Sequence, residues 1–285
     1  MGFESIRHGH KEGDGLSAKG VEQAKEKAGA MLEEIDNAPD GTVTYIMTSN
    51  VGRAVATRDN IEASLRDRTQ DREDIDFISV QDKEAIERVK ADPSKKIVVT
   101  ELQPTMALGF NERTPSIPAF LKYKKGYKND EDLIGMTWVA KPEEMDKLKE
   151  IVKERLPDYD VDSIQPSEFK ETPEEAALKY VRLMKRTAEI TEKHFPGRPW
   201  KTLHVGHNLS ADYAAVALMR KDISLETVEK TGGKFRDFLE SSNFEVKEGK
   251  LIARYRDEEV ENEVSLDDVI KDLERKSEQR KQEWQ

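Results

Sequence analysis

An arginine and a histidine stand side by side near the start of the chain and are followed by a glycine: Arg7, His8 and Gly9. Arginine presents a planar fork of donors that suits phosphate oxygens. Histidine can be a neutral nucleophile or an acid–base group near neutral pH, and glycine lets the backbone approach a ligand closely. The three residues together suit phosphoryl chemistry, although an R-H-G triplet alone is more typical of an ordinary solvated loop.

Two later loops carry side chains of the same kinds. Arg53 lies in the loop that follows an expected strand at 42–48, and His207 follows an expected strand at 201–206. His204 competes with His207 as the second functional histidine, but it lies inside the strand, so we expect it to be structural. The sequence therefore offers three loops with oxyanion-binding residues, and the elements around them decide whether they meet.

Each of these loops stands between an expected strand and an expected helix. Short apolar or β-branched runs predict the strands, and apolar residues at helical spacing predict the helices. An alternation of strands and helices indicates an α/β fold, here a three-layer αβα sandwich with a mainly parallel central sheet, whose sites lie at the carboxyl ends of the strands. The expected strands include 3–6, 42–48, 96–100 and 201–206, and the expected helices include 17–35, 54–65, 172–194 and 211–220.

The remaining segments break this regular pattern. From about 102 to 172 the periodicity weakens around six prolines and scattered aromatic residues, apart from one clear helix at 142–156. We expect this insertion to form a cap over the site, with a scaffolding role equally compatible. The end of the chain, 232–285, predicts a β-hairpin (strands 243–246 and 251–256) and a polar helix at 265–285 whose last turns are solvated or frayed. We expect a single domain over residues 1–285.

Composition narrows the classes of function. The chain has 285 residues, with 47 basic and 58 acidic side chains and a net charge of −11, which argues against a general nucleic-acid binder. It has no cysteine, which excludes disulfides, thiolate catalysis and cysteine-based zinc sites. No secretory signal and no apolar window long enough for a membrane span are found, so we expect a cytoplasmic protein without a membrane partner.

Four motifs stand in sequence order in the two parts of the chain at 1–102 and 172–221. They are R-H-G at 7–9, L-S-x-x-G-x-x-Q-A at 16–24, S-x-x-x-R-A-x-x-T at 49–57, and a histidine at 207 between a strand and a helix. R-H-G alone is a weak signal, but the four together are fairly specific. With these motifs in this order, the chain resembles the histidine phosphatase superfamily, which has the phosphoglycerate-mutase-like fold.

The resemblance implies roles for the matching residues. His8 would attack phosphorus and become phosphohistidine, and water would then release phosphate. Arg7, Arg53 and His207 would hold the phosphate oxygens, because the transferring group is rich in negative charge. The family's chemistry needs no metal or other cofactor, and it implies a phosphorylated small molecule or a phosphoprotein as substrate.

The proton donor to the leaving group stays open. Glu101, directly after the strand at 96–100, is the first candidate, and Glu112 is the second. The family's phytase-like branch has an aspartate directly after the second histidine, but Asn208 stands there in this chain, and Asp212 is a distant third candidate. The resemblance also allows for no donor at all, because some relatives that act on phosphohistidine or other good leaving groups manage without a dedicated acid.

Three further questions are left open by the sequence. His10 and the loop at 11–15 depart from the family's usual sequence, and His10 could lie at the edge of the pocket or be solvated. The same residues also suit a mutase that moves phosphate within one substrate, or a non-catalytic protein that binds a phosphorylated ligand. The oligomeric state cannot be read from the sequence.

Overall fold

The computed structural model describes the parts of the chain that form the sheet, most of its helices and the loops between them. The described residues are 2–13, 15–100, 102–105, 131–164, 171–206, 208–219, 221–230, 241–247, 250–255, 258–262 and 264–284. Glu101, Glu112 and His207 lie outside them.

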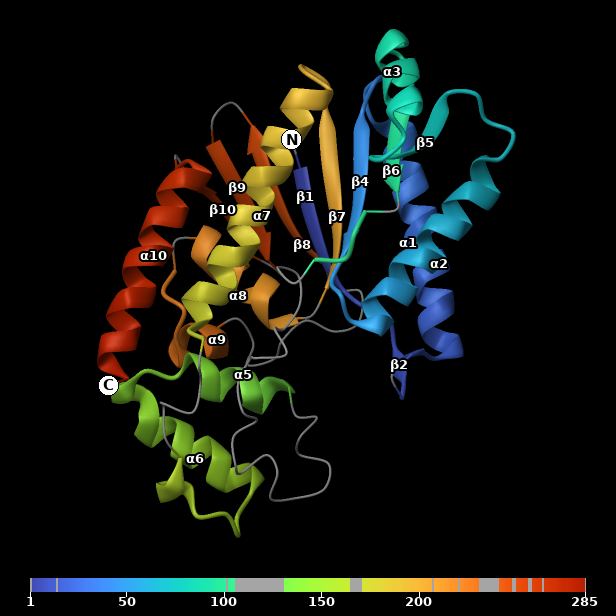
Figure 1. Ribbon diagram of the computed structural model, residues 1–285. Helices are drawn as coiled ribbons and strands as arrows, with labels where there is room; N and C mark the ends of the chain where they lie inside the picture. The colour runs from blue at the N-terminus through green and yellow to red at the C-terminus, as the bar shows by residue number, and fades with distance from the viewer. Residues whose placement is uncertain are drawn as a thin grey trace.

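The described strands form an eight-stranded mixed sheet. Its parallel strands are β1 (Gly2–Arg7), β7 (Trp200–Gly206), β4 (Val43–Thr48), β6 (Lys96–Thr100) and β5 (Ile75–Ser79), in that spatial order. Antiparallel strands β8 (Ser241–Lys247), β9 (Lys250–Tyr255) and β10 (Glu258–Asn262) continue the sheet beyond β1 (Figure 1). A separate two-stranded hairpin joins β2 (Lys11–Glu12) to β3 (Gly15–Leu16).

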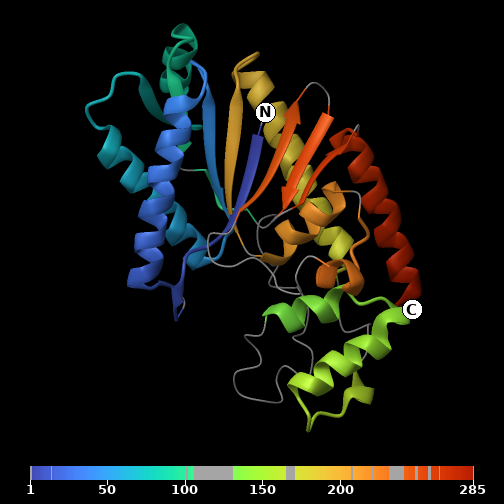
Figure 2. The ribbon, with the colours of Figure 1, turned by 180° about the vertical axis from the view of Figure 1, so that it is seen from behind.

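Helices cover both faces of the sheet, which confirms the predicted αβα sandwich. One face carries α1 (Ala18–Asn37) and α2 (Gly52–Thr69), and the other carries α7 (Pro173–His194), α8 (Asn208–Leu218) and α10 (Leu266–Glu283) (Figures 1 and 2). Helix α3 (Lys83–Ala91) connects β5 to β6, and α9 (Leu225–Lys230) follows α8.

The alternation of side chains along the strands divides the core into two layers. Ile46, Leu203 and Val205 join the apolar cluster under α1 and α2, whereas Phe3 and Tyr45 join the cluster under α7 and α8. Successive residues of a strand point to opposite faces, so a central strand of this fold must be apolar on both. This explains why the central strands read as almost continuous apolar or β-branched runs.

Two of the predicted helix starts are confirmed by their caps. Ser17 Oγ accepts a hydrogen bond from Gly20 N at 3.1 Å, and α1 follows it. Thr172 begins a capping box with Glu175, in which each side chain accepts from the other residue's N–H at 2.9–3.1 Å. Such contacts satisfy N–H groups that a helix leaves without partners at its start.

The described part of the expected insertion lies beyond the carboxyl ends of the parallel strands. It contains α5 (Glu131–Val139), the single turn η3 (Pro142–Glu144), α6 (Met145–Arg155) and the turn η4 (Val161–Ser163) (Figure 1). Trp138 is buried and its Nε1 donates to Glu171 O at 2.6 Å, and Tyr213 Oη donates to Gly135 O at 3.3 Å. Helix α5 is therefore packed firmly onto the sandwich at the end where a site is expected.

The C-terminal region differs from the prediction in two ways. The expected hairpin is present as β8 and β9, but a third strand, β10, pairs with β9. Its sequence, E-E-V-E-N, is largely acidic and offers one apolar residue, Val260, so it lacks the alternation that marks a strand. The prediction that the last turns of the final helix are solvated or frayed is wrong for two of their residues, because Ser277 and Arg280 are buried.

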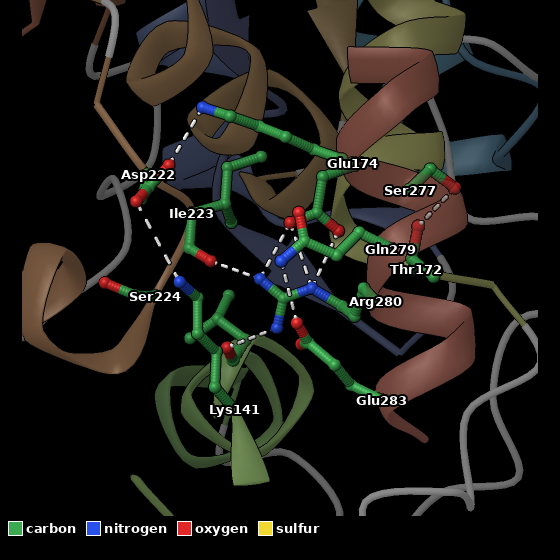
Figure 3. A network of polar contacts seen from close by, with 12 residues as sticks. Lys141, Thr172, Glu174, Asp222, Ile223, Ser224, Ser277, Gln279, Arg280 and Glu283 are labelled. Atoms are coloured by element: carbon green, nitrogen blue, oxygen red, sulfur yellow. Dashed lines mark hydrogen bonds and ion pairs between the residues drawn. The ribbon is translucent and has the colours of Figure 1, made fainter. Parts of the chain in front are cut away.

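Arg280 is the centre of a buried polar junction (Figure 3). Its Nε and Nη2 donate to the Glu174 carboxylate at 2.7–2.9 Å, its Nη1 donates to Val139 O at 2.9 Å, and its Nη2 also donates to Ile223 O. Arg280 and Glu174 are each only 3% exposed. We name this group the Arg280 junction; it ties α10 to the start of α7, the end of α5 and the loop after α8.

Candidate active site

The strands that carry the candidate residues are neighbours in the sheet. β7 pairs in parallel with β1 on one side and with β4 on the other, so Arg7 lies opposite Gly206 and Thr48 lies opposite Val205. The pairing continues past the strands, because His8 N donates to Gly206 O at 3.1 Å and Ser49 N donates to Val205 O at 2.9 Å. The three strand ends therefore meet at one edge of the sheet, as the sequence predicts.

The loop after β1 is locked to the start of α1. A Cβ atom built on Gly20 would lie 2.1 Å from His10 O, and one built on Gly9 would lie 2.8 Å from Gly20 O. His10 N donates to Gln23 Oε1 at 2.9 Å, which fixes the loop from the helix side. The R-H-G and L-S-x-x-G-x-x-Q-A motifs are thus one structural unit, in which two glycines permit a close backbone approach.

The ring of His8 is fully buried, and its orientation is fixed. Its Nδ1 lies 2.8 Å from Gly9 O, and a carbonyl oxygen can only accept, so Nδ1 carries the proton and Nε2 carries the lone pair. Burial lowers the pKa of His8 to about 3; the hydrogen bond to Gly9 acts in the opposite direction, and the nearby cations Arg53, Arg7 and Lys11 add to the lowering. His8 is therefore neutral near pH 7, the form in which an imidazole is a nucleophile.

Two residues at the start of α2 contact the R-H-G loop. Arg53 Nε donates to His8 Nε2 at 2.8 Å. Thr57 Oγ1 accepts from Gly9 N at 3.0 Å and donates to Arg53 O at 2.8 Å. The sequence predicts Arg53 near His8, whereas it assigns no role to Thr57. Its signal was present in the motif at 49–57, because a threonine one helical turn after Arg53 lies on the same helix face.

Three cations surround His8 closely enough to lower its pKa. Arg7 precedes it on β1, Arg53 begins α2, and Lys11 lies on the short strand β2. Lys11 belongs to the loop whose role the sequence left open. A positive field at a water-poor site favours an anion and stabilises negative charge that develops during a reaction.

The two remaining histidines near the motifs hold structural contacts. His10 Nδ1 lies 2.9 Å from Ser17 Oγ, and its carbonyl oxygen accepts from Ser17 N at 3.0 Å, so it braces the loop. His204 is fully buried, its Nδ1 lies 2.8 Å from Tyr180 Oη, and burial lowers its pKa to about 3. It faces α7 within the core, as expected for a structural residue.

The proposed proton donors are placed only in part. Glu101 and Glu112 lie outside the described residues, but the residues that follow Glu101 contact the start of α2 and the carboxyl end of β4. Thr105 N donates to Thr48 O at 2.8 Å, and Leu102 O accepts from Arg58 Nη1 at 2.9 Å. Asp212 is described and is buried on α8. The geometry therefore leaves the order of these candidates unchanged.

The described residues contain no group of three or more His, Cys, Asp or Glu side chains that could hold a metal ion. Within the same part of the chain, no helix is both long and apolar enough to cross a membrane.

Comparisons with protein-family models and with curated proteins gave no match. Comparison with solved structures gave matches over most of the chain to proteins of the histidine phosphatase fold. A mycobacterial hydrolase is 13% identical, with a TM-score of 0.42, and the match covers 85% of this chain and 90% of that one. A phosphoserine phosphatase mutant from Entamoeba histolytica in complex with phosphoserine is 12% identical, with a TM-score of 0.41 and coverages of 89% and 95%. A mycobacterial glucosyl-3-phosphoglycerate phosphatase is 12% identical, with a TM-score of 0.40 and coverages of 85% and 89%.

Proposed function

We propose that the protein is a phosphatase that hydrolyses a phosphomonoester through a phosphohistidine on His8, without a metal ion. The observation that supports this most is the state of His8: a buried, neutral ring whose Nε2 lone pair faces the guanidinium of Arg53 at 2.8 Å. A neutral imidazole needs neither a base nor a metal to become nucleophilic.

The proposed reaction has two steps. In the first, the Nε2 lone pair of His8 forms a bond to phosphorus while the bond from phosphorus to the ester oxygen breaks, and the leaving oxygen takes a proton from an acid, for which Glu101 is the first choice and Glu112 the second. In the second, a water oxygen forms a bond to phosphorus while the bond from phosphorus to Nε2 of His8 breaks. The carboxylate left by the first step takes the proton of the water, and neutral His8 and inorganic phosphate result. Arg7, Arg53 and His207 would donate to the phosphoryl oxygens, where preorganised donors lower the barrier.

The test is hydrolysis of p-nitrophenyl phosphate in buffer that contains a chelator. We expect His8→Ala to abolish turnover and His194→Gln to leave it unchanged, because His194 ends α7 shortly before the start of β7, whereas His8 lies at the carboxyl end of that strand. Rapid quenching should also trap acid-labile phosphate on His8. Full activity of His8→Ala would contradict the mechanism.

The same experiment separates the other functions that these residues suit. A protein that only binds a phosphorylated ligand would give no trapped phosphate and no turnover. A mutase would form the phosphohistidine but would return the phosphate to a phosphoglycerate rather than to water. A panel of phosphorylated metabolites and phosphopeptides would then identify the substrate.

A further inference from the structure

The contact between Arg53 and His8 involves the one atom that must react. The proton on Nδ1 faces Gly9 O, so the single lone pair of the His8 ring is on Nε2, and Arg53 Nε donates to that lone pair at 2.8 Å. A lone pair that accepts a hydrogen bond cannot at the same time form a bond to phosphorus. The contact therefore has to break before His8 can attack.

We propose that Arg53 is a gate on the nucleophile: it holds the His8 lone pair until an oxyanion takes over its guanidinium. The proposal rests on the function proposed above, because it assigns a regulation to the same site. Arg53 thereby acts twice, first as the group that keeps His8 unreactive and then as a donor to the phosphoryl oxygens.

The backbone that carries Arg53 is held independently of the contact between its side chain and His8. The carbonyl oxygen of Arg53 accepts from Thr57 Oγ1, and Thr57 Oγ1 accepts from Gly9 N, so the first turn of α2 is fixed to the R-H-G loop. The side chain of Arg53 is only half-buried, whereas His8 is fully buried. The proposed exchange therefore concerns the side-chain contact and leaves the backbone around it in place.

The exchange is favoured by charge. Hydrogen bonds from a guanidinium to a phosphate are charged at both ends and can be bidentate, and they are stronger than a bond to a neutral ring. Arg7 and Lys11 lie close enough to add to the positive field at His8, so a dianion gains from all three cations. A ligand with little or no negative charge gains much less and leaves Arg53 on His8.

The gate therefore implies a class of substrate. A phosphomonoester dianion can displace Arg53 from His8, whereas a neutral phosphotriester cannot, even where its phosphorus is the more electrophilic. The selection occurs before the chemical step, at the hydrogen bond between Arg53 and His8.

The first test uses nuclear magnetic resonance of 15N-labelled full-length protein and needs no turnover. The coupling across the hydrogen bond between the Arg53 Nε–H group and His8 Nε2 should be present without phosphate. It should disappear as inorganic phosphate saturates the site, and the 31P signal of the phosphate measures that saturation. A coupling that persists at saturating phosphate would overturn the proposal.

The second test uses diethyl pyrocarbonate, a neutral electrophile that acylates neutral imidazole, with the modification of His8 followed by mass spectrometry. Arg53→Met keeps the size of the side chain and frees the lone pair. We expect acylation of His8 to become about ten to a hundred times faster, the factor that a hydrogen bond from a charged group represents. Arg66→Met on the same helix is the matched control, because Arg66 instead contacts Thr100 Oγ1 at 3.1 Å and the ring of Phe77.

The two proposals fail in different ways. One outcome is that phosphate removes the Arg53 coupling while His8→Ala still hydrolyses p-nitrophenyl phosphate. In that case Arg53 does exchange His8 for phosphate, and the phosphohistidine mechanism is wrong. If phosphohistidine is trapped on His8 but the coupling survives phosphate, or Arg53→Met is acylated no faster than the Arg66→Met control, the gate alone is wrong.

Discussion

The protein contains two arginines with opposite surroundings. Arg280 is almost fully buried, and its donors go to the Glu174 carboxylate and to the carbonyl oxygens of Val139 and Ile223. Arg53 is half-buried, and its Nε donates to the neutral ring of His8. Arg280 therefore forms an ion pair with a carboxylate, whereas the Nε–H group of Arg53 donates to an uncharged acceptor.

This difference separates a structural cation from one that serves a ligand. A buried ion pair with further hydrogen bonds holds its partners in one geometry, and removing either member leaves a buried charge. A cation against a neutral imidazole forms a weaker bond, and it can exchange that bond for one to an anion. The Arg280 junction should therefore govern stability, and the Arg53–His8 contact should govern activity.

The largest effect is expected at the Arg280 junction. Arg280→Met should lower the free energy of unfolding by about 3–5 kcal/mol, because the Glu174 carboxylate stays buried without its cation. Denaturant unfolding measures this, and the rate of p-nitrophenyl phosphate hydrolysis per folded molecule should be unchanged. Arg275→Met, on the same helix but largely exposed, is the control and should have little effect on stability.

A double variant checks the physical reason for this loss. Replacing both members of the pair, as Arg280→Met with Glu174→Leu, should recover a large part of the stability, because no unpaired charge is then buried. Equal losses for the single and the double variant would instead assign the effect to the carbonyl contacts of Arg280.

The next largest effect is expected at Arg53, on activity rather than stability. Arg53→Met should lower kcat/KM for p-nitrophenyl phosphate by about 10²–10³, the usual loss for one preorganised donor to a developing charge. The free energy of unfolding should fall by less than in Arg280→Met, by about 3 kcal/mol at most, the upper value for one hydrogen bond from a charged group. A variant that is severely destabilised but fully active when folded would reverse the comparison between Arg53 and Arg280.

The sequence predicts one of these two arginines and misses the other. Arg53 follows a buried strand and begins a helix, and parallel strands bring such positions to one edge of the sheet, so its place near His8 could be inferred. Arg280 lies in the run E-R-K-S-E-Q-R-K-Q-E, where charge alone predicts a solvated helix face. Only the packing of α10 against α7 shows that this arginine faces Glu174, over a hundred residues away in the chain.

The same distinction applies to the rest of the fold. Apolar periodicity and capping residues are local signals, and they predicted the parallel strands, the start of α7 at Thr172 and the loops of the site. Strand β10 was missed because it is held by pairing with β9, and pairing between strands leaves little trace in an acidic sequence. The contact of Arg53 with the His8 lone pair also depends on a tautomer, which only the neighbouring Gly9 carbonyl reveals.

Acid should weaken the site and the neighbouring core through their buried histidines. His8 and His204 have a pKa of about 3 in the native protein against 6.5 for an ordinary histidine, so between these values the unfolded chain binds protons that the native protein does not. The free energy of unfolding should therefore fall as the pH falls from about 6.5 towards 3, by about 2 kcal/mol per histidine between pH 7 and pH 5.

Unfolding of single variants at both pH values measures each contribution. His8→Gln and His204→Gln should each flatten the pH dependence by about 2 kcal/mol, whatever they do to stability at pH 7. Protonation of His8 is opposed by its burial and by the nearby cations Arg53, Arg7 and Lys11. Arg53→Met should therefore raise the pKa of His8. An unchanged slope in His204→Gln would show that this ring is protonated at pH 5 in the native protein.

The smallest effect is expected when one neutral hydroxyl is removed from each region. Thr57→Val removes the acceptor of the buried Gly9 N–H, and should cost about 1–2 kcal/mol, within the range for a buried donor left without a partner. Ser277→Ala removes a hydroxyl 3.0 Å from Thr172 Oγ1, and should cost about 1 kcal/mol or less, because Thr172 Oγ1 still accepts from Glu175 N. Activity separates the two variants: Thr57→Val also loosens the first turn of α2 beneath Arg53, so it should lower kcat, whereas Ser277→Ala should leave kcat unchanged. If both variants kept full kcat, the hydroxyl of Thr57 would serve stability alone, and the position of Arg53 would depend on its contact with His8.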